Sequence, residues 1–371
     1  MRVLYCKNRE THRKMTNLNT FDWTRCSHQW DAWWNGESDS PMFNIRILPE
    51  PGSAVPPKGY LSMYDFSIPP EQILKEEEAW LSAFSYPEGS YPSFWLNFGP
   101  GVLAAMLGGE GHNGMDTVWF TPGRWEGVPL EQMHFQLDRK SPWFQRIESI
   151  CREADRLLKG RIHVGITDFG GALDILSTFL PGEALLFALY DAPEEVKRLT
   201  MEIHDAWFEA FDYFHSLLPA NHGWSAWDGI FSSKPYYMLQ CDFSYMISPE
   251  MFAEFVMPEL SACCKRLERS FYHLDGKGEL PHLPQLLAEE RLGGIQWVPG
   301  AGNLPFTAWE EIYRTIADGG KKIWLAPGGD FDGASRIMDA TGHPERFILC
   351  DAIPPEREKE LLRFKQRYGA K

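Results

Sequence analysis

Residues 270–280 read Ser-Phe-Tyr-His-Leu-Asp-Gly-Lys-Gly-Glu-Leu, an apolar and aromatic run that ends in a histidine, an aspartate and then glycines. The run is typical of a buried strand followed by a turn. Because side chains two residues apart on a strand point to the same side, His273 and Asp275 are expected on one face at the strand's end. Barrel enzymes carry catalytic groups at such strand ends. The pair therefore either binds a metal or transfers a proton, or it caps the strand and forms hydrogen bonds with the following turn.

Short apolar runs alternate with helical periods along the rest of the chain. Strands are expected at residues 43–48, 94–97, 117–120, 162–166, 237–239, 271–274, 295–298, 323–325 and 347–349. Helices are expected at residues 143–158 and 191–217, from Ser248 onward with a kink at Pro258, and from 354 to about 368. Strands separated by such helices pair in parallel, and about eight units in 371 residues predict an α/β fold, a single (β/α)8 TIM-type barrel. Residues 1–40 are interpreted as an N-terminal extension and residues 41–371 as the barrel.

The composition excludes several classes of partner. The chain carries 51 acidic and 36 basic residues, a formal net charge of −15, and no Lys/Arg cluster that could follow a phosphate backbone, so nucleic acid is excluded. No apolar run approaches the roughly 18 residues that a bilayer span requires, and no membrane partner is expected. Seven cysteines without a CxxC pair do not form a recognisable disulfide framework, which indicates a reducing, cytoplasmic location.

Residues 240–260 read Gln-Cys-Asp-Phe-Ser-Tyr-Met-Ile-Ser-Pro-Glu-Met-Phe-Ala-Glu-Phe-Val-Met-Pro-Glu-Leu. This segment resembles the part of the uroporphyrinogen decarboxylase family in which a strand-end aspartate precedes a Ser-Pro-Glu helix. Tyr-His-Leu-Asp-Gly at 272–276 resembles that family's His-x-Cys-Gly strand, and Asn-Phe-Gly-Pro at 97–100 and Asp-Phe-Gly-Gly at 168–171 fit the same layout. The resemblance spans residues 95–369. It implies either a tetrapyrrole decarboxylase or a methyltransferase that uses zinc and a corrinoid to methylate a thiol.

A missing arginine segment and the acidic composition favour the methyltransferase branch of the family. The Arg-Gln-Ala-Gly-Arg segment with which true decarboxylases grip carboxylates is missing, and an acidic chain is poorly equipped for an eight-carboxylate substrate. By position in that branch, the resemblance implies His273, Asp275 and Cys350 as zinc ligands. Aspartate in place of cysteine hardens such a site and weakens its preference for zinc. An ordinary buried thiol is an equally good interpretation of Cys350.

Further site residues follow from strand ends and from tryptophans near turns. Asp242 and Asp168 each follow a predicted strand, where a catalytic acid or base of a barrel enzyme belongs, with turn bonding as the alternative. Fifteen tryptophans suggest an aromatic pocket for a flat or apolar ligand, or simply additional packing. The candidate catalytic residues are Asp242, His273 and Asp168, and the candidate substrate or cofactor contacts are Tyr272, Trp297, His222, Trp227 and Asn97.

Three functions remain open at this point. The leading hypothesis is a metal-assisted, corrinoid-dependent methyltransferase acting on a small molecule. Its corrinoid is expected on a separate carrier protein, because the chain has no Asp-x-His-x-x-Gly cobalamin motif. The second is metal-free decarboxylation of a tetrapyrrole or a smaller carboxylic acid, with Asp242 or Asp168 stabilising a protonated intermediate. The third is a non-catalytic protein that binds a corrinoid, tetrapyrrole or sugar. A homodimer is an open alternative for the assembly.

Overall fold

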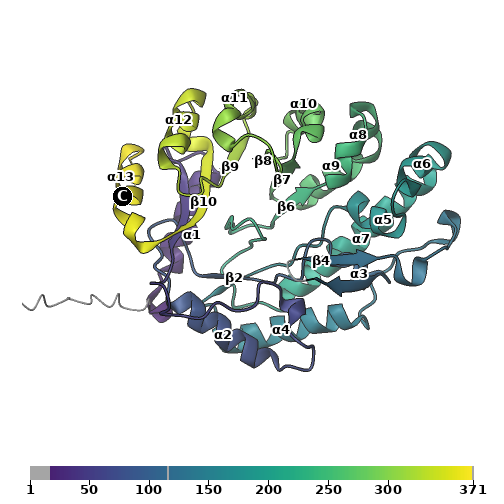
Figure 1. Ribbon diagram of the computed structural model, residues 1–371, viewed down its shortest axis with the longest axis horizontal. Helices are drawn as coiled ribbons and strands as arrows, with labels where there is room; N and C mark the ends of the chain where they lie inside the picture. Colours follow the sequence, from purple (N-terminus) through teal and green to yellow (C-terminus); the bar gives the residue numbers. More distant parts are fainter. Residues whose placement is uncertain (1–16, 115–116, 370–371) are drawn as a thin grey trace, which may run out of the picture.

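A curled parallel sheet of six strands, in the order β1-β10-β9-β8-β7-β6, forms the centre of the computed structural model, which describes residues 17–114 and 117–369 (Figure 1). Helices flank the outer face of this sheet. The strands are β1 (Met42–Ile47), β2 (Ser93–Trp95), β3 (Glu110–Asn113), β4 (Val118–Thr121), β5 (His163–Gly165), β6 (Tyr236–Gln240), β7 (Arg269–Asp275), β8 (Gly294–Val298), β9 (Lys322–Leu325) and β10 (Phe347–Ile353).

The α-helices alternate with the strands in the second half of the chain, as right-handed parallel connections require. They are α1 (Trp23–Trp34), α2 (Pro70–Ser82), α3 (Leu103–Met106), α4 (Pro142–Leu158), α5 (Ala172–Phe179), α6 (Ala184–Asp191), α7 (Pro193–Ser216), α8 (Pro249–Phe255), α9 (Met257–Arg266), α10 (Leu283–Ala288), α11 (Glu310–Asp318), α12 (Phe331–Thr341) and α13 (Glu358–Arg367). Within the described ranges no single helix is long and apolar enough to cross a membrane; α5 and α6 pass that test only as a pair bent by 108°.

Every predicted strand is present, and the architecture matches the predicted barrel in part. The last strand pairs with the first, Met42 opposite Ile348, as in a sheet that curls back on itself. However, β2 and β5 form a separate parallel pair, and the hydrogen-bonded ladders of the described residues do not close all eight parallel strands into one ring. The run predicted at 117–120 is a strand, β4, but it pairs antiparallel with β3 in a hairpin outside the main sheet.

Local chemistry explains why the ladder stops at β5. β5 has only three residues, and its free edge is occupied by irregular chain rather than by a strand. The Asn221 side chain accepts a hydrogen bond from the Val164 N–H (3.0 Å) and donates one to the Val164 carbonyl (2.8 Å). The Ile166 N–H donates to the Ser225 carbonyl (2.9 Å). These bonds satisfy the backbone on this edge of β5 without a second neighbouring strand.

The helix predictions are confirmed, including the interruption near Pro258. The chain from Ser248 forms α8 and α9, which are separated at Val256, and the Ser248 side chain caps the first of them by accepting from the Met251 N–H. Proline lacks an N–H and its ring clashes with the preceding turn, so the helix breaks at Val256 and Pro258 lies in the first turn of α9, where it is tolerated.

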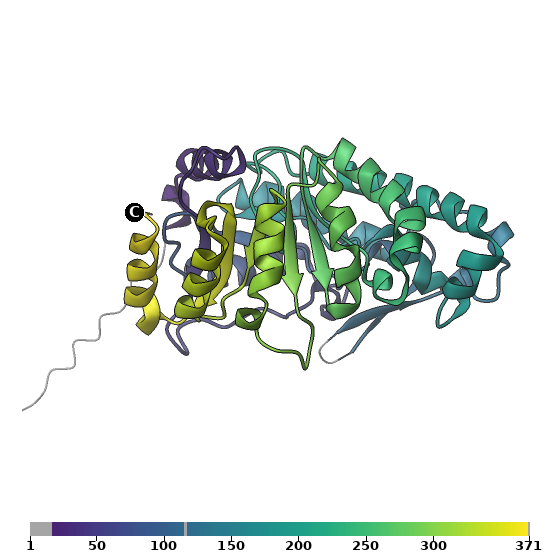
Figure 2. The ribbon, with the colours of Figure 1, turned by 90° about the horizontal axis from the view of Figure 1, so that it is seen from above.

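The N-terminal segment covers the end of the sheet at which the strands begin, opposite their C-terminal ends. Residues 1–16 of the expected extension lie outside the described residues; α1 follows and packs under the N-terminal ends of the strands (Figure 2). Arg269, which begins β7, pairs with Asp31 of α1 at 2.7 Å. The Lys322 ammonium, at the start of β9, donates to the Trp33 carbonyl at 2.7 Å. The described part of the extension therefore leaves the other end of the sheet open.

Replacement of Trp30 tests how much this helix stabilises the fold. Trp30 is completely buried and its indole N–H donates to the Gly89 carbonyl at 3.1 Å. Trp30→Ala is expected to lower the free energy of unfolding by about 3–5 kcal/mol, because it opens a large cavity. Urea denaturation measures the loss. Trp119→Ala is the control, since Trp119 is 46% exposed in the hairpin and should change stability little; equal effects of the two changes would contradict this assignment.

Candidate active site

Asp242, His273 and Asp275 meet where β6 and β7 end. One ligand atom of each lies within 4.8 Å of the other two. His273 and Asp275 stand on the same side of β7, as their spacing requires, with His273 Nε2 3.9 Å from Asp275 Oδ2. Asp242 begins a 3-10 helix, Asp242–Met246, directly after β6. The imidazole is 15% exposed and the Asp275 carboxylate 41% exposed, so the group is accessible to a small ligand.

Gln296 orients the imidazole. It lies on β8 in register with His273, it is buried, and its Oε1 is 2.6 Å from His273 Nδ1. Because an amide oxygen only accepts, Nδ1 carries the proton and the lone pair of Nε2 faces the two aspartates. The indole of Trp227 stands edge-on to the ring at 5.2 Å. The histidine is thus fixed in the tautomer that a metal ligand needs.

Asp174 fixes the position of Asp242. Its Oδ2 accepts from the Asp242 N–H (3.1 Å) and its Oδ1 from the Phe243 N–H (2.8 Å). Burial, followed by repulsion from Asp242, raises the pKa of Asp174 to about 7. Asp242 is exposed to solvent at the end of the sheet where β6 and β7 finish, which we call the mouth. Desolvation by the surrounding protein and the charge of Asp275 nevertheless raise the pKa of Asp242, and His273 has the opposing effect.

Glu279 holds the backbone of Asp275 in place through a hydrogen bond. Its Oε2 accepts from the Asp275 N–H at 3.1 Å, and the whole side chain is buried. Burial, together with nearby Asp242 and Asp174, raises the pKa of Glu279 to about 9, so this carboxyl is neutral at pH 7. Glu279 Oε1 and Asp275 Oδ1 are both buried without a hydrogen-bond partner among the described residues.

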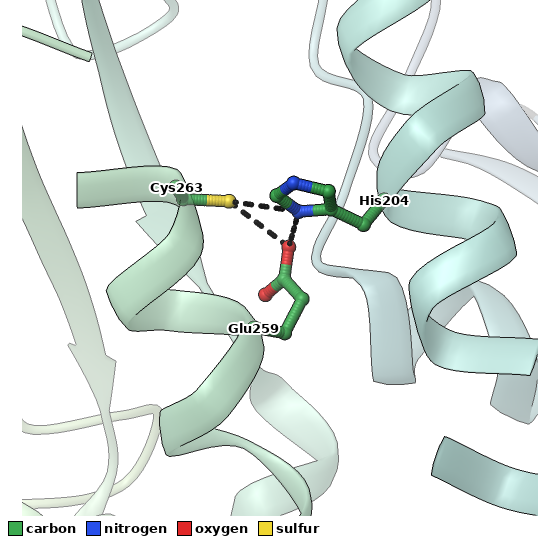
Figure 3. Close-up of side chains that lie close together, drawn as sticks. All are labelled: His204, Glu259 and Cys263. Carbon is green, nitrogen blue, oxygen red and sulfur yellow. Dashed lines mark hydrogen bonds and ion pairs between the residues drawn. The ribbon is translucent and has the colours of Figure 1, made fainter. Parts of the chain in front are cut away.

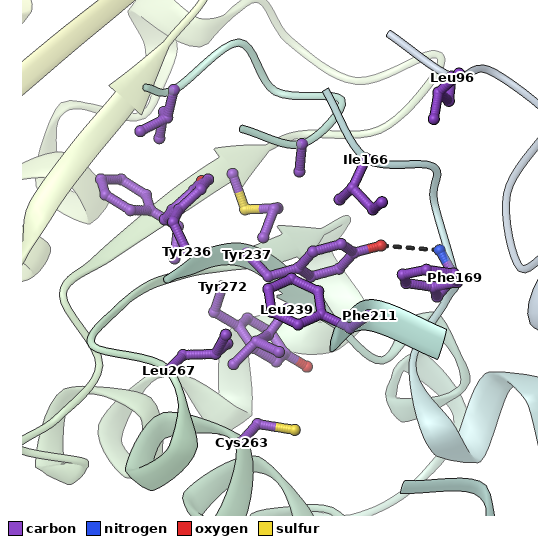
Figure 4. Packing of buried hydrophobic residues seen from close by; sticks show 14 of the residues in the cluster. Leu96, Ile166, Phe169, Phe211, Tyr236, Tyr237, Leu239, Cys263, Leu267 and Tyr272 are labelled. Carbon is purple, nitrogen blue, oxygen red and sulfur yellow. Dashed lines mark hydrogen bonds between the residues drawn. The ribbon is translucent and has the colours of Figure 1, made fainter. Parts of the chain in front are cut away.

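Asp168 follows β5 and is held in a rigid turn. Its Oδ1 accepts from the Gly170 N–H at 2.9 Å. The Tyr237 hydroxyl accepts from the Phe169 N–H (2.8 Å) and donates to the Thr167 carbonyl (3.1 Å), which ties this loop to β6 (Figure 4). Burial, opposed by the Gly170 bond and assisted by Asp242 and Asp228, raises the pKa of Asp168 to about 7.

The third expected metal ligand, Cys350, does not join the group of three. It is buried on β10, and a Cβ at Gly229 would lie 3.9 Å from its sulfur. Burial, and then the charge of Asp228, raises the pKa of its thiol well above the usual value. The structure brings Asp242 to His273 and Asp275 instead. The placement agrees with the interpretation of Cys350 as an ordinary buried thiol.

The expected ligand contacts are scattered. Trp227 lies at His273. Asn97 accepts from the Gly99 N–H of its own turn (3.1 Å) and donates to the Gly59 carbonyl of an earlier loop (2.7 Å). His222 is exposed and stacks on Trp23, the first residue of α1, at 4.6 Å, at the end of the sheet that α1 covers. His222 therefore takes no part in the site.

Tyr272 and Trp297 lie on the helix side of the sheet, away from the site. Tyr272 contacts Phe252 of α8 with ring centroids 6.5 Å apart, and Trp297 packs against Trp309 at 5.3 Å. Because side chains alternate along a strand, the neighbour of an inward His273 or Gln296 points outward. This placement corrects the expectation that they contact a ligand.

Comparison with known proteins gives a likeness of fold. No family model matches the chain, and no curated protein sequence matches it. A solved structure of a methyltransferase from Methanosarcina mazei matches with a TM-score of 0.57 and 12% identity, covering 93% of this chain and 99% of that one.

The raised pKa of Glu279 predicts how stability depends on pH. Between its unfolded value of about 4.5 and its folded value of about 9, the folded state keeps a proton that the unfolded chain releases. The free energy of unfolding should therefore fall as pH rises through this window, by up to about 1.4 kcal/mol per pH unit from this group. Glu279→Gln removes the titration, and its advantage over the unaltered protein should widen steadily from pH 5 to pH 9.

Urea titrations at several pH values measure the difference. Glu268→Gln is the matched control, because Glu268 is 56% exposed in a surface pair with Lys234. That variant should follow the unaltered protein at every pH. Parallel pH profiles for Glu279→Gln and the unaltered protein would show that the buried carboxyl does not titrate as described.

Proposed function

We propose that this chain is a metal-dependent methyltransferase built on a (β/α)8-type barrel of the uroporphyrinogen decarboxylase kind. The observation that carries the proposal is the meeting of Asp242, His273 and Asp275 at the ends of two adjacent parallel strands. Catalytic groups of such folds occupy this position. The fold shared with a methyltransferase supports the choice of reaction.

The three side chains offer a donor set that zinc binds in proteins. Nitrogen and oxygen ligands of a tetrahedral zinc, each about 2.0–2.2 Å from the metal, lie about 3.3–3.6 Å apart, so His273 and Asp275, at 3.9 Å, would move together by a few tenths of an ångström around the ion. The buried, unpartnered Asp275 Oδ1 is a second oxygen without compensation, as expected of a carboxylate that takes a cation. Zinc bound there supplies Lewis-acid activation of the methyl acceptor at neutral pH.

The protein's own groups have distinct tasks in this proposal. His273 presents Nε2 while Gln296 holds the proton on Nδ1. Asp174 keeps Asp242 at the mouth through two backbone bonds. Asp168, whose pKa of about 7 is raised in part by the charge of Asp242, can give or take a proton near neutral pH. Two carboxylates make the set harder than one with thiolates, so Mn²⁺ or another oxygen-preferring ion competes with zinc.

The rim of the mouth suits a large methyl donor. Tyr245 and Met246 are the last two residues of the 3-10 helix that begins at Asp242, and both side chains are more than half exposed. Leu304, in the loop after β8, is also more than half exposed. Exposed apolar side chains around a site are typical of a docking surface. We propose that a corrinoid on a separate carrier protein docks here and that a small molecule accepts the methyl group.

Metal-free decarboxylation is the second candidate, because Asp168 is a buried carboxyl that is half protonated near neutral pH. It would donate a proton to the carbanion left by loss of CO₂. This reaction does not use the His273 lone pair. Activity kept in His273→Ala but lost in Asp168→Asn would favour it over methyl transfer.

His273→Ala is the primary test of the proposed function. The variant should lose one equivalent of bound metal and at least about 100-fold of methyl transfer from methylcobalamin to a thiol or hydroxyl acceptor, because a ligand and its orientation are lost together. Metal analysis and product analysis measure the two effects. His134→Ala, an exposed surface histidine, is the control. Purified protein without metal, with activity unaffected by chelators, would refute the proposal.

Gln296→Leu tests the positioning of the histidine. Without the amide oxygen, Nδ1 loses its acceptor and the tautomer is no longer fixed, so the zinc concentration for half-maximal reactivation of chelator-treated enzyme should rise about 10–100-fold. Gln296→Glu keeps an acceptor at the same place and should restore most of the affinity. Identical zinc dependence of both variants and the unaltered enzyme would show that Gln296 serves packing alone.

A further inference from the structure

A second group of metal-ligating side chains lies between α7 and α9, outside the sheet (Figure 3). His204 Nδ1 is 3.0 Å from Glu259 Oε1, and Cys263 Sγ is 2.9 Å from the same oxygen and 3.6 Å from the imidazole nitrogen. Glu259 and Cys263 are four residues apart, so they share one face of α9. His204 faces them from α7, and both His204 and Cys263 are buried.

We propose that His204, Glu259 and Cys263 form a zinc site that is separate from the candidate active site. Imidazole, carboxylate and thiolate are the three ligand types that zinc combines in proteins. The separations of 2.9–3.6 Å are within the distance at which two ligands can share one zinc ion. The site has no residue in common with Asp242, His273 and Asp275, and it does not depend on the proposed function.

A small cavity beside the group provides room for a fourth ligand. It is bordered by Glu259, Cys263, Thr200 and Trp207, and its volume of about 20 Å³ holds about one water molecule. Three protein ligands and one water complete a tetrahedral zinc site. A hydrogen-bonded triad of the same residues does not need this space.

Charge also favours a cation at this place. Without metal, the Cys263 thiol and the His204 Nδ1–H both donate to the single oxygen Glu259 Oε1. On binding, the thiol proton leaves to solvent, the sulfur bonds the metal, and the His204 proton moves from Nδ1 to Nε2. One thiolate and one carboxylate then balance a divalent ion.

Such a site would hold α7 and α9 together next to the end of β6, which leads to Asp242. The cavity also borders Gln240 and Cys241, the residues that lead from β6 into Asp242. Tying α9 to α7 therefore holds the layer on which the end of β6 rests.

Cobalt substitution distinguishes this site from the one at the mouth, because only this group contains a thiolate. The full chain loaded with Co²⁺ should show a near-ultraviolet thiolate-to-cobalt band, which Cys263→Ser abolishes with the loss of one equivalent of bound metal. Cys264→Ser is the matched control, since Cys264 is the adjacent buried cysteine and contacts Ser270 instead. Cys264→Ser should keep both the band and the metal. The band should also persist in His273→Ala.

If Cys263→Ser does not fold, Glu259→Gln gives the same decision, because glutamine keeps the size and one acceptor oxygen of the side chain. That variant should bind the metal at least 10-fold more weakly at this site. No thiolate band in the cobalt-loaded protein, or a band that survives both Cys263→Ser and Glu259→Gln, would overturn the assignment and leave a hydrogen-bonded triad. Loss of the band with His273→Ala alone would equally overturn it.

Discussion

The parallel register of β6, β7 and β8 is the constraint on which the site depends. Gln240 lies opposite His273, and His273 opposite Gln296, so the polar groups of three strands arrive at one edge of the sheet. The period of two then turns His273 and Asp275 to the same side. A slip of β7 by one residue would turn both side chains toward the helices and separate the imidazole from its Gln296 acceptor.

Local patterns predicted most of the architecture. Apolar runs marked every described strand except β3, which is polar, and Pro258 marked the break between α8 and α9, because both signals act over a few residues. The closing of the sheet was a different matter. Whether β5 joins the main sheet depends on Asn221 and Ser225, which lie more than 50 residues along the chain and bond the edge of β5 that does not face β2. No periodicity in the sequence reports such a contact.

The site could be predicted only where its geometry is local. The spacing of His273 and Asp275 is such a case, whereas Gln296, Asp174 and Glu279 act across strands or from loops, and no local spacing in the sequence predicts these contacts. Asp174, for example, bonds the backbone of Asp242, 68 residues away. The same alternation that places His273 inward places Tyr272 outward, so that expectation conflicted with information already present in the sequence.

The concentration of carboxyls around the mouth narrows the chemistry that the site can accommodate. A divalent ion would balance Asp242 and Asp275, but Asp168 and Asp174, with pKa values of about 7, remain partly ionised at neutral pH. A substrate with many carboxylates would be repelled by this field. A neutral or cationic methyl acceptor meets no such penalty. The electrostatics of the mouth thus favour methyl transfer over decarboxylation of a polycarboxylate tetrapyrrole, independently of the fold comparison.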